Sequence, residues 1–220
     1  MASQPLTTCL LGCLFFFVVA TTMAKEQVYH RVLDNYVWSA SPEYSYQVVS
    51  TQTNDLATVY VINMTSVNWL GEKEMGPRAH WFHYLEVAVP KNLDKTLKQG
   101  LLYITNGYTS PSAPTGDTDM SYLANSSRTI CTALHQVPNQ FLAFNSDPNH
   151  KEREEDGIIA YAWMKFMANT TNYEWIPRLP MVKASVLAMD TVQAFAKKQL
   201  KVQINTFTVS GASKRGWTGK

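Results

Sequence analysis

The 220-residue chain carries little charge. Asp, Glu, Lys and Arg together make up 16% of the residues, the formal net charge is +2, and the basic residues do not gather into a patch. Such a chain offers no basic surface to a nucleic acid, so no nucleic-acid partner is expected. Hydrophobic residues reach 45% and aromatic residues 12%, which favours one packed globular domain over a disordered chain.

Cysteine is scarce as well. Only three cysteines occur, and two of them, Cys9 and Cys13, lie in an apolar N-terminal stretch. The third, Cys131, has no companion in the rest of the chain, so the sequence offers no disulfide framework. We expect Cys131 either to be a small buried hydrophobe or to pair with a cysteine outside this chain.

The sequence also lacks a metal-binding pattern. The pair His80 and His83 has no matching cluster of cysteines or carboxylates, so neither a zinc site nor another cofactor is expected. On a strand these two side chains would face opposite sides, because they are an odd number of residues apart. A structural role is therefore favoured for all the histidines, which are His30, His80, His83, His135 and His150.

The first 24 residues contain no Asp, Glu, Lys or Arg. Residues 10–20 form an apolar block that is shorter than the ~20 residues a bilayer crossing requires, and residues 22–24 place small side chains where signal peptidase cleaves. We expect a signal peptide over residues 1–24 and a secreted, extracellular protein with no stable membrane anchor after cleavage. The alternative is an N-terminal anchor that is not cleaved.

Three N-x-S/T sequons follow this segment, at Asn63, Asn125 and Asn169. A single sequon arises often by chance, but three sequons behind a signal peptide favour N-glycosylation. We therefore expect glycans on all three asparagines, and we expect these asparagines to lie on loops or exposed edges.

The hydrophobic pattern predicts strands first and alternating strands and helices later. Residues 44–62 are typical of two strands joined by the turn-prone residues 53–55, and a third strand over 80–89 ends at Pro90, which cannot donate to a ladder. The elements predicted after it are a buried strand (100–105), a helix (119–134), a second buried strand (138–144), helical sequence from the charged residues 151–156 to Met167, a helix (180–198) and a strand (202–209).

This order predicts an α/β fold, in which an N-terminal antiparallel meander leads into a parallel sheet with crossover helices. No internal repeat, low-complexity tract or second domain boundary interrupts the pattern. Residues 25–220 are therefore expected to belong to a single domain.

The last predicted strand leads into residues 211–216, where Ser213 is flanked by Gly211 and Gly216. Small residues are needed around the serine of a nucleophile elbow, because the strand-to-helix turn is sharp and strained. The second glycine follows the serine by three residues instead of two, so the strict G-x-S-x-G pattern is not met. From the local pattern alone, a nucleophile elbow and an ordinary turn are equally favoured.

An oxyanion hole requires two backbone N–H groups. In an elbow of this kind one comes from the residue after the nucleophile, here Lys214, and the other from the loop after an earlier strand. Asn106 and Gly107 follow the buried strand 100–105 and match that position, with glycine permitting close approach. The alternative is a plain Asn-Gly turn.

Other charged residues are expected to be solvated. The pairs Lys197-Lys198 and Lys214-Arg215 are too short to form a phosphate-binding patch. The alternating charges of residues 151–156 are typical of a solvated helix start, and a carboxylate pair for glycoside chemistry is a remote alternative.

Residues 210–217, together with residues 102–107 and 40–42, resemble the PhoPQ-activated pathogenicity-related family. This family also includes the autocrine proliferation repressor proteins. The resemblance runs from about Tyr36 to Trp217, and the Ser-Gly-Ala-Ser-Lys-Arg-Gly-Trp block at 210–217 is its most specific part.

The resemblance implies an α/β-hydrolase-like fold, a secreted protein and a serine nucleophile at Ser213. Family members continue beyond this block to the candidate acid and histidine, whereas only four residues follow Gly216 here. The chain is therefore expected to be the N-terminal part of such a domain, truncated at its C-terminus, without a complete triad and poorly soluble.

Two functions follow as hypotheses. The first is a serine-hydrolase-like protein, a peptidase or esterase by ancestry, acting on a peptide or ester substrate. The second is a non-catalytic secreted signalling protein that represses proliferation by binding a cell-surface receptor.

Overall fold

The structure, a computed structural model, describes residues 31–116 and 118–219. The predicted signal peptide, residues 1–24, lies outside the described residues. The described residues divide into two units, one that ends at Ser39 and one that begins at Ala40. In the first unit, residues 31–37 are helical.

The second unit is built on one six-stranded sheet with the strand order β1-β2-β3-β5-β4-β6. Three strands form an antiparallel meander, and β3 pairs in the antiparallel sense with β5. Strand β4 is parallel to β5 on one side and to β6 on the other. The strands are β1 (Ser45–Thr53), β2 (Ala57–Asn68), β3 (His80–Pro90), β4 (Gln99–Ile104), β5 (Ile130–Leu134) and β6 (Thr206–Gly211).

The first hairpin shows how local chemistry fixes the register. The side-chain carbonyl of Asn54 accepts hydrogen bonds from the N–H groups of Leu56 (2.9 Å) and Ala57 (2.8 Å). Asparagine is favoured at such turns because its side chain takes the place of a backbone acceptor. The predicted hairpin and the strand ending at Pro90 are both confirmed.

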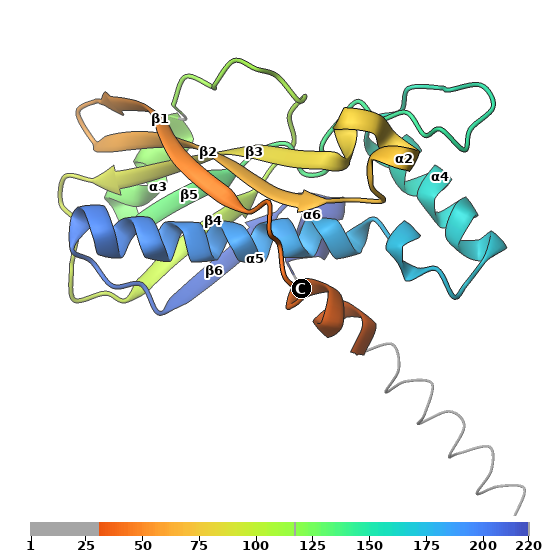
Figure 1. The fold of residues 1–220 in the computed structure, drawn as a ribbon. Helices are drawn as coiled ribbons and strands as arrows, with labels where there is room; N and C mark the ends of the chain where they lie inside the picture. Colours follow the sequence, from red (N-terminus) through yellow and green to blue (C-terminus); the bar gives the residue numbers. More distant parts are fainter. Residues whose placement is uncertain (1–30, 117, 220) are drawn as a thin grey trace, which may run out of the picture. The chain divides into compact units, whose positions relative to one another are not determined.

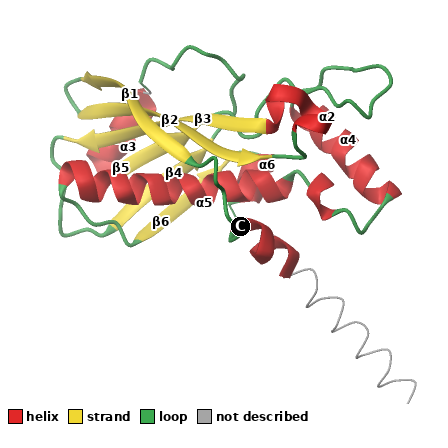
Figure 2. Ribbon diagram, viewed as in Figure 1, coloured by secondary structure: helices red, strands yellow, loops and turns green. Residues whose placement is uncertain are grey.

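Helices cover both faces of the sheet, as Figures 1 and 2 show. On one face α5 (Arg178–Phe195) packs into the larger core with β2 and β3, through residues such as Val192 and Trp81. On the other face α3 (Thr118–Ser127) packs on a smaller cluster that includes Met120 and Cys131. The antiparallel meander, the parallel strands and the covering helices confirm the predicted α/β class.

The remaining helices are short or lie at the ends of the strands. They are α2 (Glu72–Met75), α4 (Glu155–Ala168), α6 (Lys214–Thr218), two 3-10 turns (Gly76–Ala79 and Tyr173–Trp175) and a π-helical turn (Ala196–Leu200) that continues α5. In the part of the chain that the structure describes, no helix combines the length and the apolar character needed to cross a membrane.

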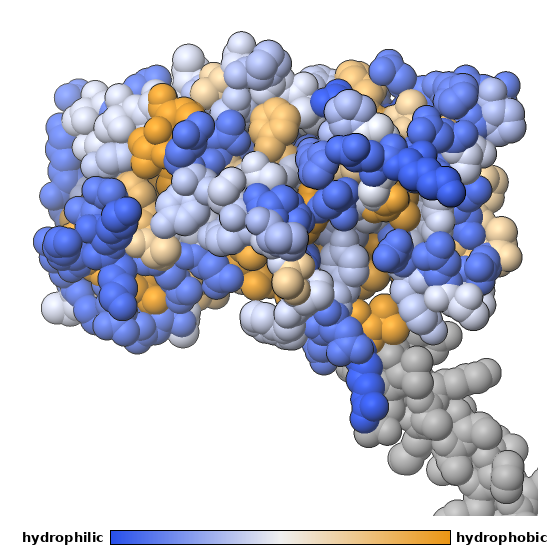
Figure 3. Space-filling model, viewed as in Figure 1, coloured by the Kyte–Doolittle hydropathy of each residue, from blue (hydrophilic) through white to orange (hydrophobic). Residues whose placement is uncertain are grey.

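Hydrophilic side chains cover much of the face seen in Figure 3, with smaller hydrophobic patches between them.

Cys131 is buried, and its thiol is not in a disulfide within the described residues. Burial raises the pKa of this thiol. Cys131 is therefore the small buried hydrophobe that was one of the two expectations.

Two predicted elements between residues 119 and 144 are wrong. The predicted helix ends early, because Arg128 adopts a left-handed conformation (φ 58°), and Ile130–Leu134 then form a strand in which every residue is buried. A short apolar run of this kind fits a buried strand as well as a helix. Residues 138–144 form a loop, with an isolated bridge between Leu142 and Arg153 instead of a strand.

The last strand begins four residues later than predicted. Lys201 takes a left-handed conformation (φ 57°) at the end of the π-helical turn, and Val202 and Ile204 are buried in the connection that follows. The apolar pattern at these two positions therefore reflects packing of the connection and not a strand. Strand β6 starts at Thr206.

Candidate active site

Ser213 lies between the end of β6 and the start of α6. Its backbone has φ 56° and ψ −125°, a conformation that a non-glycine residue adopts at a cost of about 1–3 kcal/mol. The residue is exposed. A strained, exposed serine at a strand-to-helix turn has the geometry of a nucleophile elbow.

The glycines on either side of Ser213 face each other across this turn. A Cβ atom on Gly216 would lie 2.5 Å from the carbonyl oxygen of Gly211, and a Cβ atom on Gly211 would lie 2.8 Å from the carbonyl carbon of Arg215. Neither position leaves room for a side chain. The spacing of three residues after the serine thus still produces a close approach that only glycine allows.

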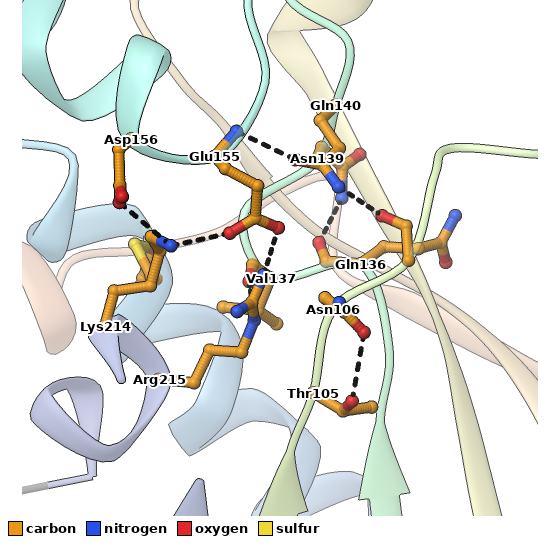
Figure 4. A network of polar contacts seen from close by, with 12 residues as sticks. Thr105, Asn106, Gln136, Val137, Asn139, Gln140, Glu155, Asp156, Lys214 and Arg215 are labelled. Atoms are coloured by element: carbon orange, nitrogen blue, oxygen red, sulfur yellow. Dashed lines mark hydrogen bonds and ion pairs between the residues drawn. The ribbon is translucent and has the colours of Figure 1, made fainter. Parts of the chain in front are cut away.

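Two basic residues that follow Ser213 are buried. Lys214 is 8% exposed and Arg215 is 6% exposed. The ammonium of Lys214 lies 2.6 Å from Oε2 of Glu155 and 2.9 Å from Oδ1 of Asp156. The guanidinium of Arg215 donates to Oε1 of Glu155. Figure 4 shows both basic side chains converging on this one carboxylate.

These ion pairs set the charge states of the residues involved. Burial opposes the charge on Glu155, but the hydrogen bonds from Lys214 and Arg215 outweigh it and lower the pKa of the carboxyl. Burial also opposes the charge on Lys214, and the hydrogen bonds to Glu155 and Asp156 outweigh it and raise the pKa of the ammonium. Both Glu155 and Lys214 are therefore charged at neutral pH.

The expectation of solvated charges is thus wrong for Lys214, Arg215 and Glu155, whereas the acidic residues Glu152, Glu154 and Asp156 are exposed as expected. The two segments lie about sixty residues apart in the chain, and the fold brings the start of α4 against the start of α6. No local sequence signal identifies the pairing, because charges of both signs are also typical of an exposed helix start.

Asn106 and Gly107 lie at the same edge of the sheet as Ser213. Ile104, the last residue of β4, is level with Leu134 of β5 and with Gly211 of β6, so the three parallel strands end together. Ligands of open α/β sheets bind at this carboxyl edge. The sheet therefore places the loop after β4 and the turn after β6 side by side, as the sequence predicts.

The loop after β4 is fixed by buried amide side chains from the loop after β5. Gly107 has φ 133°, and its carbonyl accepts a hydrogen bond from the side chain of Gln140 (3.2 Å). The carbonyl of Asn106 accepts from the backbone N–H of Gln136 (3.0 Å). Gln136 and Gln140 are 2% and 3% exposed.

Gln140 also connects this loop to the ion pairs. Its side-chain oxygen accepts the backbone N–H of Glu155 (3.0 Å), and the side chain of Arg215 donates to the carbonyl of Val137 (2.8 Å). A continuous set of polar contacts thus runs from Gly107 through Gln140 and Glu155 to the residues after Ser213. Figure 4 shows the part from Gln140 to Lys214 and Arg215. Glu155 and Gln140 are residues that sequence reasoning missed.

Three of the histidines that the structure describes make side-chain contacts elsewhere. His80 lies 3.0 Å from Glu72, and His135 lies 3.4 Å from Glu86. His83 is buried between the hydroxyl of Ser66 (2.9 Å) and the carbonyl of His135, and burial lowers its pKa to about 4. Its imidazole is therefore neutral at physiological pH.

The three sequons lie in different surroundings. Asn169 is exposed at the C-terminal end of α4, where its side-chain oxygen accepts from the hydroxyl of Thr171 (2.7 Å). Asn63 lies within β2, paired with Gln47 of β1 on one side and Tyr84 of β3 on the other. Asn125 lies within α3. The expectation that all three lie on loops or exposed edges is wrong for Asn63 and Asn125.

A surface hollow of about 640 Å³ lies at the opposite edge of the sheet. It is formed by the end of α5 and the connection that leads to the amino end of β6, with Gln193, Lys197 and Ile204 among its lining residues. Because β6 runs away from it toward Gly211, this hollow is separate from the edge that carries Ser213.

Sequence comparison identifies relatives of the chain. The profile of a family described as PhoPQ-activated pathogenicity-related protein matches residues 33–219. Autocrine proliferation repressor protein A of Dictyostelium discoideum is 34% identical over 193 residues, which are 87% of this chain and 38% of that protein. The chain thus spans well under half the length of this relative.

Structure comparison finds more distant similarities. A candidate acetyl xylan esterase from Bacteroides fragilis has a TM-score of 0.47 at 12% identity, with 88% of this chain and 47% of that chain covered. A glucuronoyl esterase from Solibacter usitatus has a TM-score of 0.46 at 11% identity, with 86% of this chain and 52% of that chain covered.

Replacing Glu155 by Gln leaves two buried cations without their shared partner. We expect the free energy of unfolding to fall by about 3 kcal/mol, the lower end of the range for breaking a buried pair, because the carboxylate keeps some solvent contact. Chemical denaturation at pH 7 measures this loss. Asp156→Asn is the control: Asp156 is exposed, so its loss should change stability far less. Equal effects of the two substitutions would contradict the account.

The stability lost in Glu155→Gln should depend on pH. The folded-state pKa of Glu155 is lowered, so its ion pairs stabilise fully above the unfolded-state value of about 4.3 and are lost as pH falls through the folded value. The buried, neutral His83 destabilises the fold from about pH 6.5 downward in both proteins. The difference in stability between wild type and Glu155→Gln should therefore stay constant above about pH 5 and shrink below about pH 4.3. A difference that shrinks already near pH 6 would show that another group is responsible.

The surroundings of the sequons predict unequal glycosylation. In protein secreted from eukaryotic cells, Asn169→Gln should remove a glycan, whereas Asn63→Gln should leave the glycan content unchanged because Asn63 is paired on both sides within the sheet. Gel mobility before and after enzymatic deglycosylation measures both. The control is Asn172→Gln, just outside the sequon, which should leave the glycan in place. Loss of a glycan from Asn63→Gln but not from Asn169→Gln would refute the prediction.

Proposed function

The chain belongs to the PhoPQ-activated pathogenicity-related protein family, and from this premise we propose that it is a secreted α/β-hydrolase-like protein with Ser213 as the nucleophile of acyl transfer from a peptide or an ester. The observation that carries the proposal is the conformation of Ser213. A positive φ at an exposed serine, between two glycines that tolerate no side chain, is the strain that a nucleophile elbow requires.

In this reaction the Ser213 hydroxyl attacks the substrate carbonyl. As negative charge develops on the carbonyl oxygen, the backbone N–H of Lys214 and an N–H of the loop at Asn106 and Gly107 donate hydrogen bonds to that oxygen. Collapse of the tetrahedral intermediate then breaks the peptide or ester bond, releases the amine or alcohol and leaves the acyl group on Ser213. Lys214 is the first residue of α6, so its N–H has no acceptor within the helix. The side chain of Lys214 is bound to Glu155, so the backbone N–H is the group of Lys214 that can donate to the oxyanion.

The attack also requires a base that takes the serine proton. The ammonium of Lys214 is unsuited to this role, because its pKa is raised by Glu155 and Asp156. His80, His83 and His135 make their contacts with Glu72, Ser66 and Glu86. The proposal therefore assigns the nucleophile and the oxyanion donors, and it leaves the base unassigned.

Secretion is supported by the sequence of residues 1–24, with its uncharged apolar block and small residues before Lys25. The sequons behind this segment agree with a path through the secretory compartment, and Asn169 is the position most open to modification.

A second function is supported by the 34% identity to Autocrine proliferation repressor protein A. In that case the chain is a secreted signalling protein without catalysis, and it represses proliferation by binding a cell-surface receptor. The elbow would then be a structural feature kept from a hydrolase ancestor.

A fluorophosphonate probe separates the two functions, because it bonds only to an activated serine. The enzyme proposal expects labelling of the protein purified from the medium of the cells that produce it, loss of labelling in Ser213→Ala, and full labelling in Ser210→Ala, a matched serine in the preceding strand. Absence of labelling in the wild type, or equal labelling after Ser213→Ala, would overturn the enzyme proposal and leave the signalling function.

A further inference from the structure

Two aromatic rings are stacked at the surface, in loops at the edge of the sheet that carries the candidate site. The rings of Tyr108 and Phe141 lie 5.1 Å apart between centroids with planes 12° from parallel. Tyr108 is 59% exposed and Phe141 is 37% exposed. Neither ring is part of the two hydrophobic cores. A parallel pair of exposed rings presents a flat apolar surface to solvent, which is a feature of binding sites.

The position of the pair follows from the strands that end at this edge. Tyr108 comes directly after Gly107, in the loop that follows β4, and Phe141 comes directly after Gln140, in the loop that follows β5. Because β4, β5 and β6 end level with one another, the two rings and Ser213 belong to the same edge of the sheet.

Buried hydrogen bonds hold the backbone beneath the rings. The N–H of Thr109 donates to the carbonyl of Gln140 (2.7 Å), and the N–H of Gln140 donates to the hydroxyl of Thr109 (3.1 Å). The side chain of Gln136 donates to the carbonyl of Tyr108 (3.4 Å). These bonds immobilise both loops, so the rings are arranged before any ligand arrives.

A carboxylate stands at the rim of the stacked rings. The N–H of Glu155 is bonded to the side chain of Gln140, which brings the preceding residue, Glu154, next to the loop that carries Phe141. The charge of Glu154 raises the pKa of the Tyr108 phenol. Glu154 is exposed. The cations of this region are instead bound by other carboxylates: Lys214 and Arg215 by Glu155 and Asp156, and Arg153 by Asp147.

These features favour a positively charged ligand. The face of an aromatic ring attracts cations, and a carboxylate close to the ring adds an attraction of the same sign. We propose that Tyr108 and Phe141, with Glu154 at their rim, form a subsite that holds a cationic group of the substrate, an alkylammonium or a guanidinium, beside Ser213.

This inference rests on the proposed function only in that it calls the bound ligand a substrate. Binding of a cation to the subsite can be tested without catalysis. The Ser213→Ala variant is titrated with choline and with 3,3-dimethyl-1-butanol, a neutral molecule of the same shape, and the two Kd values are measured by NMR. We expect choline to bind about 3- to 10-fold more tightly than the neutral alcohol. The preference should weaken at high salt, because Glu154 is exposed.

Variants assign the preference to the residues of the subsite. Tyr108→Leu should abolish the preference for choline, Glu154→Gln should reduce it, and Glu152→Gln, a nearby exposed carboxylate, should leave it unchanged. Equal Kd values for choline and the alcohol, or a preference that survives Tyr108→Leu, would overturn the inference. Binding of methyl glucopyranoside in place of choline, lost in Tyr108→Leu, would also overturn it, since the stacked rings would then bind a neutral sugar.

The outcome is independent of the enzyme proposal. If the wild type is not labelled by the fluorophosphonate but choline binding depends on Tyr108, the cation subsite stands and the catalytic role of Ser213 fails. If labelling depends on Ser213 but choline shows no preference, the catalytic role stands and the subsite fails.

Discussion

The ion pairs between Glu155 and the two basic residues after Ser213 join segments that are far apart in the sequence. Lys214 and Arg215 begin α6, Glu155 begins α4, and the backbone of Glu155 is bonded in turn to Gln140. Gln140 holds the loop at Gly107. The position of the strained serine and the position of the proposed oxyanion loop therefore depend on the same carboxylate.

Burying these charged groups costs free energy, which argues that the ion pairs have a role in function as well as in stability. Two buried cations and one partly buried carboxylate lose much of their hydration, and a buried ion pair often stabilises a fold no better than apolar side chains would. Ser213 adds backbone strain at the same place. Strain and buried charge gather at functional sites, where geometry matters more than stability. The aromatic pair at Tyr108 and Phe141 extends this fixed edge toward solvent.

Sequence reasoning predicted those features that depend on local chemistry. The hairpin around Asn54, the strand that ends at Pro90 and the turn at Ser213 follow from turn residues, alternation and small side chains. The sequence pattern predicts the end of a helix at Ile130–Leu134, where the structure has a strand, because a short buried run has no periodicity that separates the two. The pairing of Glu155 with Lys214 and Arg215 could not be predicted, since it depends on how two distant helix starts meet, and solvated charges have the same local pattern.

Amide hydrogen exchange tests most directly whether Glu155 couples the serine turn to the loop after β4. The N–H of Thr109 is bonded to Gln140 and the N–H of Trp217 is bonded to Ser213, so each reports the opening of one segment. In Glu155→Gln the account predicts faster exchange at both amides by a similar factor, with Asp156→Asn close to wild type. Faster exchange at Trp217 alone, with Thr109 as in the wild type, would contradict the coupling.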